Sequence, residues 1–157
     1  MDETPPSLLD LTTYLLTRVG KTARGRLGER LARLELRLWH MAVLAALTDF
    51  GPHSQRELSS RLSIDPSDMV KLLDELSARG WVERARDGAD RRRIQVTITE
   101  RGRSALADLS REAEAVQHEV LAPLDEQERA QLHGLLLQVF RQLNSPGHGE
   151  AGTDKRT

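Results

Sequence analysis

The sequence predicts a mainly α-helical protein that carries one small β-hairpin. Most of its apolar residues recur at intervals of three and four, which is the period of amphipathic helices. Residues 94–98 instead alternate apolar and polar side chains, the period of a strand with one buried face. Shortly before them, the pair Asp87 and Gly88 is a hairpin signal. With 157 residues, the chain is long enough to bury one hydrophobic core.

The most clearly defined helix is expected over residues 66–79. Asp65 precedes Pro66, which suits the first helical position, and Asp68 stands where a capping-box acid would bond the exposed amides. Gly80 is expected to end the helix. The apolar residues of this segment, at the helical period, are Met69, Val70, Leu72, Leu73 and Leu76.

Two strands are expected after this helix, the first beginning at residues 81–83 and the second at Ile94. The loop between them, residues 86–92, is longer than a two-residue turn, and its tip is basic. A capped helix, a strand, a charged turn and a second strand, in that order, make up a winged helix. The charged hairpin would be its wing.

These residues carry a family resemblance. The segment DPSDMVKLLDELSARGWVERARDGADRRRIQVTITERG resembles the core of the MarR family of winged helix-turn-helix repressors, including the GWVER strand, the DRR wing and the TITERG entry to the next helix. Upstream, SQRELSSRL resembles the shorter helix of the family, and FGPHS the turn before it. The resemblance covers residues 38–102 and implies a winged helix-turn-helix with N- and C-terminal dimerisation helices.

Amphipathic helices are predicted on both sides of this region. Ser7, with Asp10 three residues later, is expected to cap a long N-terminal helix, which glycines at 20, 25 and 28 weaken by up to about 1 kcal/mol each relative to alanine. Two further helices are expected over residues 103–121 and 128–143. The apolar residues of the N-terminal helix are Leu8, Leu11, Leu15, Val19, Ala23, Leu27 and Leu31.

In the resembled family the terminal helices of two subunits interlock, so a homodimer is expected. Periodicity alone leaves a second interpretation open, in which these helices enlarge the core of a monomer. The predicted division is an N-terminal dimerisation helix and connection over 1–36, the winged helix-turn-helix over 37–102, C-terminal dimerisation helices over 103–144 and a disordered tail over 145–157.

Composition excludes some classes of function. The chain has no cysteine, so neither disulfides nor a thiol redox switch can operate. It contains no run of 18 apolar residues, and its acidic start lacks the positive segment of a signal peptide, so we expect a cytoplasmic protein without a membrane partner. The net charge is −1, yet residues 86–103 contain six arginines and three acids. The predicted wing therefore carries a local positive patch.

The exposed N-terminal surface of the 66–79 helix is the expected reading surface for double-stranded DNA, because recognition helices present this end to the major groove. Ser67, Asp68 and Lys71 are the base-reading candidates: Ser67 can donate or accept, Lys71 can bond guanine, and Asp68 can accept from cytosine. The alternative for Asp68 is a purely capping role.

Other residues are expected to contact the DNA backbone. Ser54, Gln55 and Arg56 lie at a predicted helix start, where Ser54 can cap the helix and also help to hold a phosphate. On the wing, the resemblance implies that Asp90 pairs with a neighbouring arginine and that an arginine at the tip enters the minor groove. The alternative is a solvated charge run. The basic or acidic wing candidates are Arg86, Asp90, Arg91, Arg92 and Arg93.

Catalysis, cofactors and metals find little support. The Gly20-Lys21-Thr22 triplet lacks the earlier glycine of a phosphate loop and lies in a helical period. The five histidines are scattered, and only Glu114 with His118 has a same-face helical spacing, which is more often a surface pair than half of a metal site. We therefore expect neither an enzyme nor a cofactor.

Small-molecule control is a further expectation from the resemblance, since relatives often release DNA when an aromatic or phenolic anion enters a crevice beside the dimer helices. Tyr14, Arg18, Trp39 and His40 combine rings with polar tips and are the candidates for lining such a crevice. For Trp39, packing in the protein interior is the alternative.

Together these observations predict a sequence-specific, DNA-binding transcriptional regulator, a ligand-responsive repressor that binds a palindromic operator as a homodimer. A winged domain that serves as a protein-interaction scaffold, with a solvated wing, is the alternative. Preference for a palindromic DNA site would distinguish the two.

Overall fold

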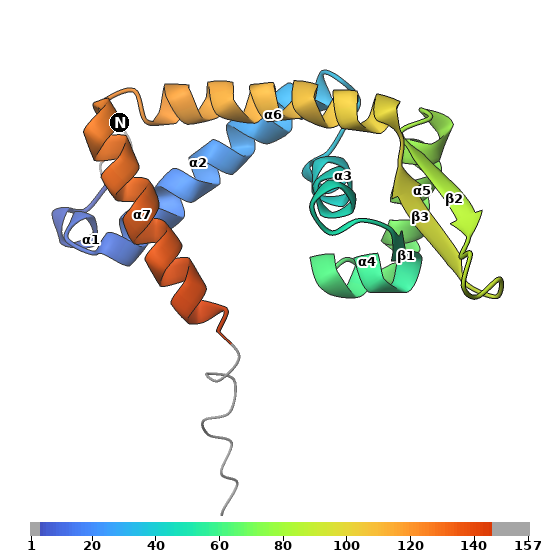
Figure 1. Ribbon diagram of the computed structural model, residues 1–157. Helices are drawn as coiled ribbons and strands as arrows, with labels where there is room; N and C mark the ends of the chain where they lie inside the picture. The colour runs from blue at the N-terminus through green and yellow to red at the C-terminus, as the bar shows by residue number, and fades with distance from the viewer. Residues whose placement is uncertain (1–3, 146–157) are drawn as a thin grey trace, which may run out of the picture. The chain divides into compact units, whose positions relative to one another are not determined.

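A computed structural model describes residues 4–145 (Figure 1). The chain divides into two compact units, one up to Gln117 and one from His118 onward. The fold is mainly helical with one small antiparallel sheet, which confirms the predicted fold class. The elements are α1 (Pro6–Leu9), α2 (Thr12–Ala32), α3 (Leu38–Phe50), β1 (His53–Ser54), α4 (Gln55–Leu62), α5 (Pro66–Ala78), β2 (Val82–Arg86), β3 (Ile94–Ile98), α6 (Glu100–Val120) and α7 (Glu126–Leu143).

The sheet contains three strands in the order β1-β3-β2, with both pairings antiparallel. The predicted hairpin is β2 with β3, in the register Val82 opposite Ile98 and Arg86 opposite Ile94. The third strand, β1, was missed because two residues show no periodicity; its His53 lies opposite Val96. The hairpin follows α5 and leads into α6, and in Figure 1 its turn points away from the start of α6.

A core of aliphatic side chains holds α3, α4 and α5 against the sheet. Met69, Leu72, Leu73 and Leu76 of α5 are buried, as the helical period predicted. Val70 belonged to the same apolar set but is 40% exposed, because its position falls off the inward stripe. The other fully buried side chains include Leu31, Val43, Leu44, Leu47, Leu58, Val82, Val96 and Leu109.

Two glycines permit close or left-handed backbone at the ends of these elements. Gly80 has φ +70°, a conformation that favours glycine, and the Trp81 amide donates to the Leu76 carbonyl at 3.0 Å, so α5 ends near the predicted position. Gly102, at the start of α6, faces the Trp81 main chain so closely that a Cβ would lie 2.1 Å from the Trp81 carbonyl oxygen. The start of α6 can pack this closely against the Trp81 main chain because Gly102 has no side chain.

The N-terminal helix differs from its prediction. The chain forms a short α1 and then α2, with Pro5 at the N-cap of α1 and no side-chain cap. Ser7 therefore lies inside α1, and Asp10 follows its last residue, so the predicted Ser7 cap is wrong. The glycines at 20, 25 and 28 all lie within an uninterrupted α2. Of the predicted apolar stripe, Leu31 is buried, whereas Leu11, Leu15 and Val19 are exposed.

The last two helices begin earlier than predicted. α6 begins at Glu100 and α7 at Glu126, where the Asp125 carboxylate accepts the Glu128 amide in a capping box. α7 buries no residue in the single chain, and Leu135, Val139 and Leu143 are among its exposed apolar side chains. The predicted disordered tail lies, after Ser145, outside the described residues.

Candidate nucleic-acid interface

The N-terminus of α5 is capped by Asp65. Its carboxylate accepts the Ser67 amide at 2.8 Å and also the Ser67 hydroxyl proton, and these bonds, the hydroxyl first, hold the pKa of Asp65 below its usual range. The capping box predicted through Asp68 does not form; the cap is the Asp65 carboxylate alone, which accepts the Ser67 amide. Asp68 is exposed.

The exposed side of α5 carries the three predicted base-reading residues. Ser67, Asp68 and Lys71 are all exposed, and they occupy the first two turns of the helix. Within residues 4–145, the Lys71 ammonium has no hydrogen bond or ion pair to another side chain. The Ser67 hydroxyl donates to Asp65 and keeps its acceptor lone pairs. This surface offers one free donor and several acceptors.

The predicted phosphate-binding helix start is α4. Ser54 and Glu57 form a capping box: the Glu57 amide donates to the Ser54 hydroxyl at 3.2 Å, and the Ser54 amide donates to the Glu57 carboxylate at 2.7 Å. Hydrogen bonds from the Ser54 amide and hydroxyl, with a smaller contribution from Arg93, lower the pKa of Glu57. Gln55 is half-buried, and Arg56 is exposed.

Main-chain and carboxylate contacts hold the wing in shape. The Asp87 amide donates to the Arg93 carbonyl at 2.8 Å, and Asp90 accepts the Arg92 amide at 3.0 Å. Arg86 donates to the Arg91 carbonyl at 3.0 Å. Asp90 thus holds the loop through the main chain of its neighbour, not by the predicted pairing with a guanidinium, because the tight turn brings an amide to it first.

The wing arginines fall into two groups. Arg91 and Arg92 are exposed, and in the described part of the chain their guanidinium groups bond no other residue. Arg93 instead pairs with Glu57 of α4 at 3.0 Å, and Arg86 is used within the loop. Sequence periodicity did not reveal this division, because the partners lie on another element or on the main chain.

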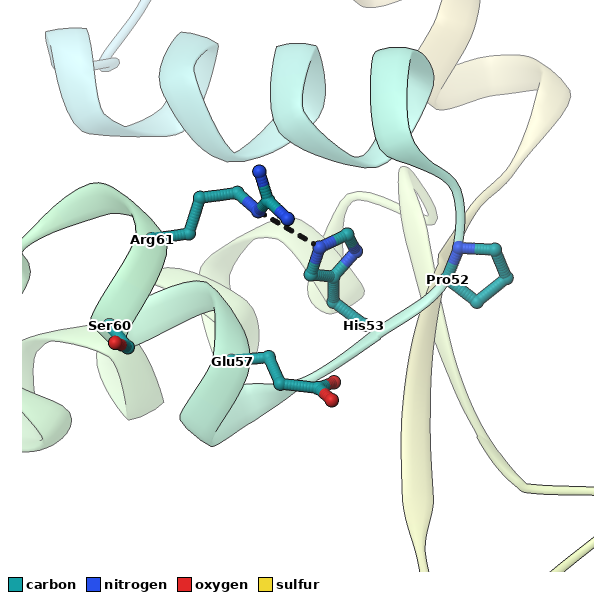
Figure 2. A pocket seen from close by; sticks show the side chains of 5 residues that line it. All are labelled: Pro52, His53, Glu57, Ser60 and Arg61. Atoms are coloured by element: carbon teal, nitrogen blue, oxygen red, sulfur yellow. Dashed lines mark hydrogen bonds between the residues drawn. The ribbon is translucent and has the colours of Figure 1, made fainter. Parts of the chain in front are cut away.

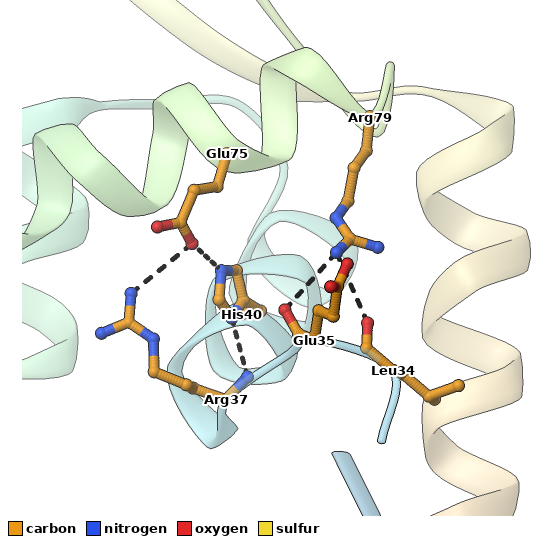
Figure 3. A network of polar contacts seen from close by, with 6 residues as sticks. All are labelled: Leu34, Glu35, Arg37, His40, Glu75 and Arg79. Atoms are coloured by element: carbon orange, nitrogen blue, oxygen red, sulfur yellow. Dashed lines mark hydrogen bonds and ion pairs between the residues drawn. The ribbon is translucent and has the colours of Figure 1, made fainter. Parts of the chain in front are cut away.

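Two of the three acidic residues of α5, Asp74 and Glu75, are paired with cations or donors from other elements. Arg84 of β2 contacts Asp74 at 2.8 Å. His40 of α3 contacts Glu75 at 2.5 Å, and the Arg37 guanidinium lies 3.5 Å from the same oxygen (Figure 3). The hydrogen bond from His40 is the main cause that lowers the pKa of Glu75. The recognition-helix candidate is therefore less negative than its sequence indicates.

The four predicted ligand residues do not come together in one chain. Tyr14 precedes Ala32, the last residue of α2, by 18 positions, which at about 1.5 Å per residue separates Tyr14 from the α2–α3 connection by about 27 Å. Arg18 is exposed one turn further along α2. Trp39 is 39% exposed on α3, whereas His40 is 1% exposed and bonded to Glu75.

A shallow pocket of about 450 Å³ lies beside α4, lined by Pro52, His53, Glu57, Ser60 and Arg61 (Figure 2). The sequence patterns did not predict it. Both ring nitrogens of His53 are already bonded: its Nε2 accepts from Arg61 at 3.1 Å, and its Nδ1 bonds the Gly51 carbonyl at 2.8 Å. The Arg61 guanidinium also lies 4.2 Å from the centre of the Phe50 ring. These contacts brace α4 against the end of α3.

Neither a metal cluster nor a membrane span accompanies this surface within residues 4–145. No three His, Asp or Glu side chains gather there to hold a metal ion. No described helix is both long enough and apolar enough to span a bilayer. The arrangement of a short helix, a capped helix with an exposed N-terminal side, and a hairpin with free arginines defines a winged helix-turn-helix domain.

Comparison with known proteins agrees with this class. The sequence profile of the MarR family matches residues 34–93. The curated relative "HTH-type transcriptional repressor NicR" of Pseudomonas putida is 28% identical over 106 residues, covering 68% of this chain and 67% of NicR. The similarity to NicR therefore extends over about two thirds of both chains.

Solved structures extend the likeness to the terminal helices. Wild-type MarR of E. coli, in its apo form, superposes with a TM-score of 0.73 at 25% identity, covering 88% of this chain and 98% of MarR. CouR of Rhodococcus jostii, bound to p-coumaroyl-CoA, gives a TM-score of 0.71 at 27% identity, covering 91% and 98%. Over these residues the chain is similar to the MarR family, whose members are transcriptional regulators and not enzymes.

Proposed function

We propose that the protein is a repressor that binds a palindromic DNA operator as a homodimer. The observation that carries the proposal is that the guanidinium groups of Arg91 and Arg92 bond no other residue within 4–145, on a wing that is itself fixed by Asp90 and is joined to α5 through Arg84. A loop whose shape is already fixed loses little conformational entropy when its arginines bind DNA. Arginine also suits a narrow minor groove.

Each element has a proposed role at the DNA. The exposed N-terminal side of α5 enters the major groove, where Ser67, Asp68 and Lys71 read bases. The start of α4 bonds the sugar-phosphate backbone through Arg56 and the amides near Ser54 and Gln55. Arg86 and Arg93, which the sequence placed with the DNA contacts, are proposed to shape the wing instead, because they are bonded within the protein.

Relatives support the repressor and operator parts of the proposal. NicR is named a transcriptional repressor, and a mutant of E. coli MarR complexed with operator DNA superposes at a TM-score of 0.62 and 27% identity, covering 80% of this chain and 90% of that one. A dimer with two-fold symmetry places two recognition helices on two half-sites, so its operator is expected to be a palindrome.

An aromatic or phenolic small molecule is the proposed effector. CouR was solved with p-coumaroyl-CoA, a phenolic thioester. Tyr14 with Arg18 on α2 is one candidate contact for it and Trp39 on α3 is another, whereas His40 is enclosed by its own partners. A ligand of this kind would release DNA only if it binds the free dimer more tightly than the DNA-bound dimer.

Titration of the full-length protein with the DNA upstream of its own gene, followed by fluorescence anisotropy, tests the DNA proposal. We expect the palindromic site to bind at least about 10³-fold more tightly than random DNA of the same length. Lys71→Ala should weaken the palindromic site by about 1 to 3 kcal/mol and leave random DNA unchanged. Equal affinity of the wild type for both DNAs would instead support a protein-interaction scaffold.

A further inference from the structure

The buried histidine of α3 links the core to the recognition helix. We propose that His40 is a positioning residue for DNA reading, which sets the rotation of α5 by donating its Nε2 proton to Glu75. The inference rests on the proposed function, because it assigns base reading to α5. It gives a role to a side chain that the sequence placed in a ligand crevice.

The hydrogen bonds define the tautomer of His40. The Arg37 amide at the N-cap of α3 donates to Nδ1 at 2.9 Å, so Nδ1 must carry a lone pair (Figure 3). A neutral imidazole then has its one proton on Nε2. That proton points to the Glu75 carboxylate, whose oxygen lies 2.5 Å from Nε2. His40 therefore caps α3 with one nitrogen and holds α5 with the other.

Burial makes the second bond hard to replace. The His40 side chain is 1% exposed, whereas Glu75 is 49% exposed. Without the carboxylate, the Nε2 proton would be left without an acceptor in a place that water reaches poorly, which costs a buried donor its full desolvation penalty. Glu75 reaches inward to His40, and the Arg37 guanidinium lies 3.5 Å from the same carboxylate oxygen, so the Glu75 charge is satisfied by α3 and its N-cap residue.

The hydrogen bond between His40 and Glu75 depends on its direction, unlike the apolar contacts between α3 and α5. Leucine side chains can slide or rotate against each other at little cost, whereas a hydrogen bond weakens steeply when its angle departs from linear. Glu75 lies four residues after Lys71, so the two share one side of α5. A rotation that broke the His40 bond would also turn the Lys71 ammonium away from its base.

The polar contacts that Arg79 and Arg84 make at α5 leave this rotation less well fixed. Arg79, at the C-cap, donates to the Leu34 and Glu35 carbonyls at 3.4 Å, and Arg84 contacts Asp74 on an exposed side. Exposed pairs of this kind contribute little and are screened by salt. Among the described residues, His40 supplies the polar contact to α5 that is made from inside the core.

The test compares His40→Leu, which has neither nitrogen, with His40→Gln, whose amide offers both an acceptor and a donor. Leu should lower affinity for the palindromic site about tenfold while random DNA stays within about twofold, since base contacts demand geometry and phosphate contacts tolerate rotation. Gln, a natural capping-box residue, should stay within about threefold of the wild type. A role in stability alone would shift both DNAs equally.

Glu75→Ala is the second arm and should also lose discrimination. The double variant should lose less than the sum of the two single losses, because both changes remove the bond between His40 and Glu75. Nitrogen-15 NMR of the wild type at pH 7 should show His40 as the Nε2–H tautomer. An Nδ1–H tautomer, or a folded His40→Leu or Glu75→Ala variant with unchanged discrimination, would overturn the proposal. If His40→Leu does not fold, the proposal is tested by the DNA discrimination of Glu75→Ala and by the tautomer of His40 in the wild type.

These arms separate failure of the inference from failure of the proposed function. If the wild type itself bound the palindrome and random DNA equally, the DNA proposal would fail. The positioning role would then fail with it, although the tautomer would still report the bond between the two helices. If the wild type discriminates and the variants do so equally well, only the role of His40 is lost.

Discussion

Three of the four acidic side chains on the two helices that are proposed to face DNA are bonded by a residue of another element. The pairs are Asp74 with Arg84, Glu75 with His40, and Glu57 with Arg93. Unpaired carboxylates near phosphates would repel them, so pairing reduces the electrostatic cost of an acidic recognition helix. The pairs of Asp74 and Glu75 also join α5 to β2 and α3, and the pair of Glu57 with Arg93 joins α4 to the wing.

Wing variants should separate charge from loop shape. Arg91→Ala removes an unpaired guanidinium, so affinity should fall for palindromic and random DNA alike, and the salt dependence should become shallower by roughly one unit if one phosphate contact is lost. Arg92→Ala should behave in the same way. Titrations at three salt concentrations measure both effects.

The matched variant for the wing is Asp90→Ala. Because Asp90 accepts the Arg92 amide and not its guanidinium, this change loosens the loop but leaves both charges in place. We expect weaker binding with an unchanged salt slope, and an effect that adds to that of Arg92→Ala. Wild-type binding by Arg91→Ala and Arg92→Ala at every salt concentration would show that the wing is solvated.

Stability should fall in acid. The pKa values of Asp65, Glu57 and Glu75 are all lowered in the folded state, mainly by hydrogen bonds from Ser67, Ser54 and His40 respectively. A lowered folded pKa means that the unfolded chain takes up protons first. The stabilisation is therefore present above the ordinary carboxyl pKa, near 4.5 for Glu and 3.8 for Asp, and is lost as the pH falls through the lower folded values.

Urea denaturation between about pH 3 and 7 measures this loss, with Asp65→Asn as the variant. The asparagine can still cap α5 but does not titrate, so its unfolding free energy should depend less steeply on pH than that of the wild type below about pH 5. Equal slopes for the two proteins would contradict the assignment of Asp65 to this effect.

For the helices and strands, the features that depend on neighbouring residues were predicted well, whereas contacts between residues far apart in the sequence were not. The Asp65–Pro66 start, the inward leucines and the left-handed Gly80 defined α5 almost to its ends, because caps and periods are encoded within a few residues. The strand β1 was missed, since its pairing with β3 involves residues about 40 positions away. The break between α1 and α2 was not predicted, because Ser7 offered a plausible cap for one long helix.

A glycine contact between elements gives a sharp prediction. In Gly102→Ala the new Cβ would lie 2.1 Å from the Trp81 carbonyl, so α6 or the backbone after α5 must shift. Overpacking of this kind typically costs about 1 to 3 kcal/mol. Thermal unfolding followed by circular dichroism measures the change.

Gly20→Ala is the control for this substitution. Gly20 lies within α2, and no atom lies within 4 Å of the place that its new Cβ would take, so the same methyl group should leave stability unchanged or raise it by up to about 1 kcal/mol through helix propensity. Two variants with the same melting temperature would show that α6 does not pack against Trp81 as described.

For the molecule as a whole, the sequence predicted a DNA-facing surface but did not predict which of its residues are bonded within the protein. Arg93, Arg86 and His40 have bonded partners that no local pattern indicates, and so their proposed roles changed from contact to support. Ser67, Lys71 and Arg91 keep their proposed roles, because exposure on a capped helix or a hairpin tip follows from local signals alone.

Both units expose apolar side chains that a single chain leaves uncovered. In the first unit, Leu11, Leu15 and Val19 of α2 are 51%, 41% and 49% exposed. In the second unit, the exposed apolar residues of α7 are Leu135, Leu136, Val139, Phe140 and Leu143. Surfaces of this kind commonly mark protein interfaces, which supports the proposed homodimer and the proposed dimerisation role of residues 1–36 and 103–144.

Charge placed on this face of α7 should separate the subunits. Val139→Glu puts a carboxylate among the exposed apolar side chains, and burying an unpaired charge in an interface is strongly unfavourable. Gln138→Glu adds the same charge one residue earlier, on another side of the helix, and should stay dimeric. Light scattering at micromolar concentration should report a monomer only for Val139→Glu, which should also bind a palindrome no more tightly than a single half-site, because it loses the second recognition helix. A Val139→Glu protein that remained dimeric and bound the palindrome like the wild type would show that α7 does not form the interface.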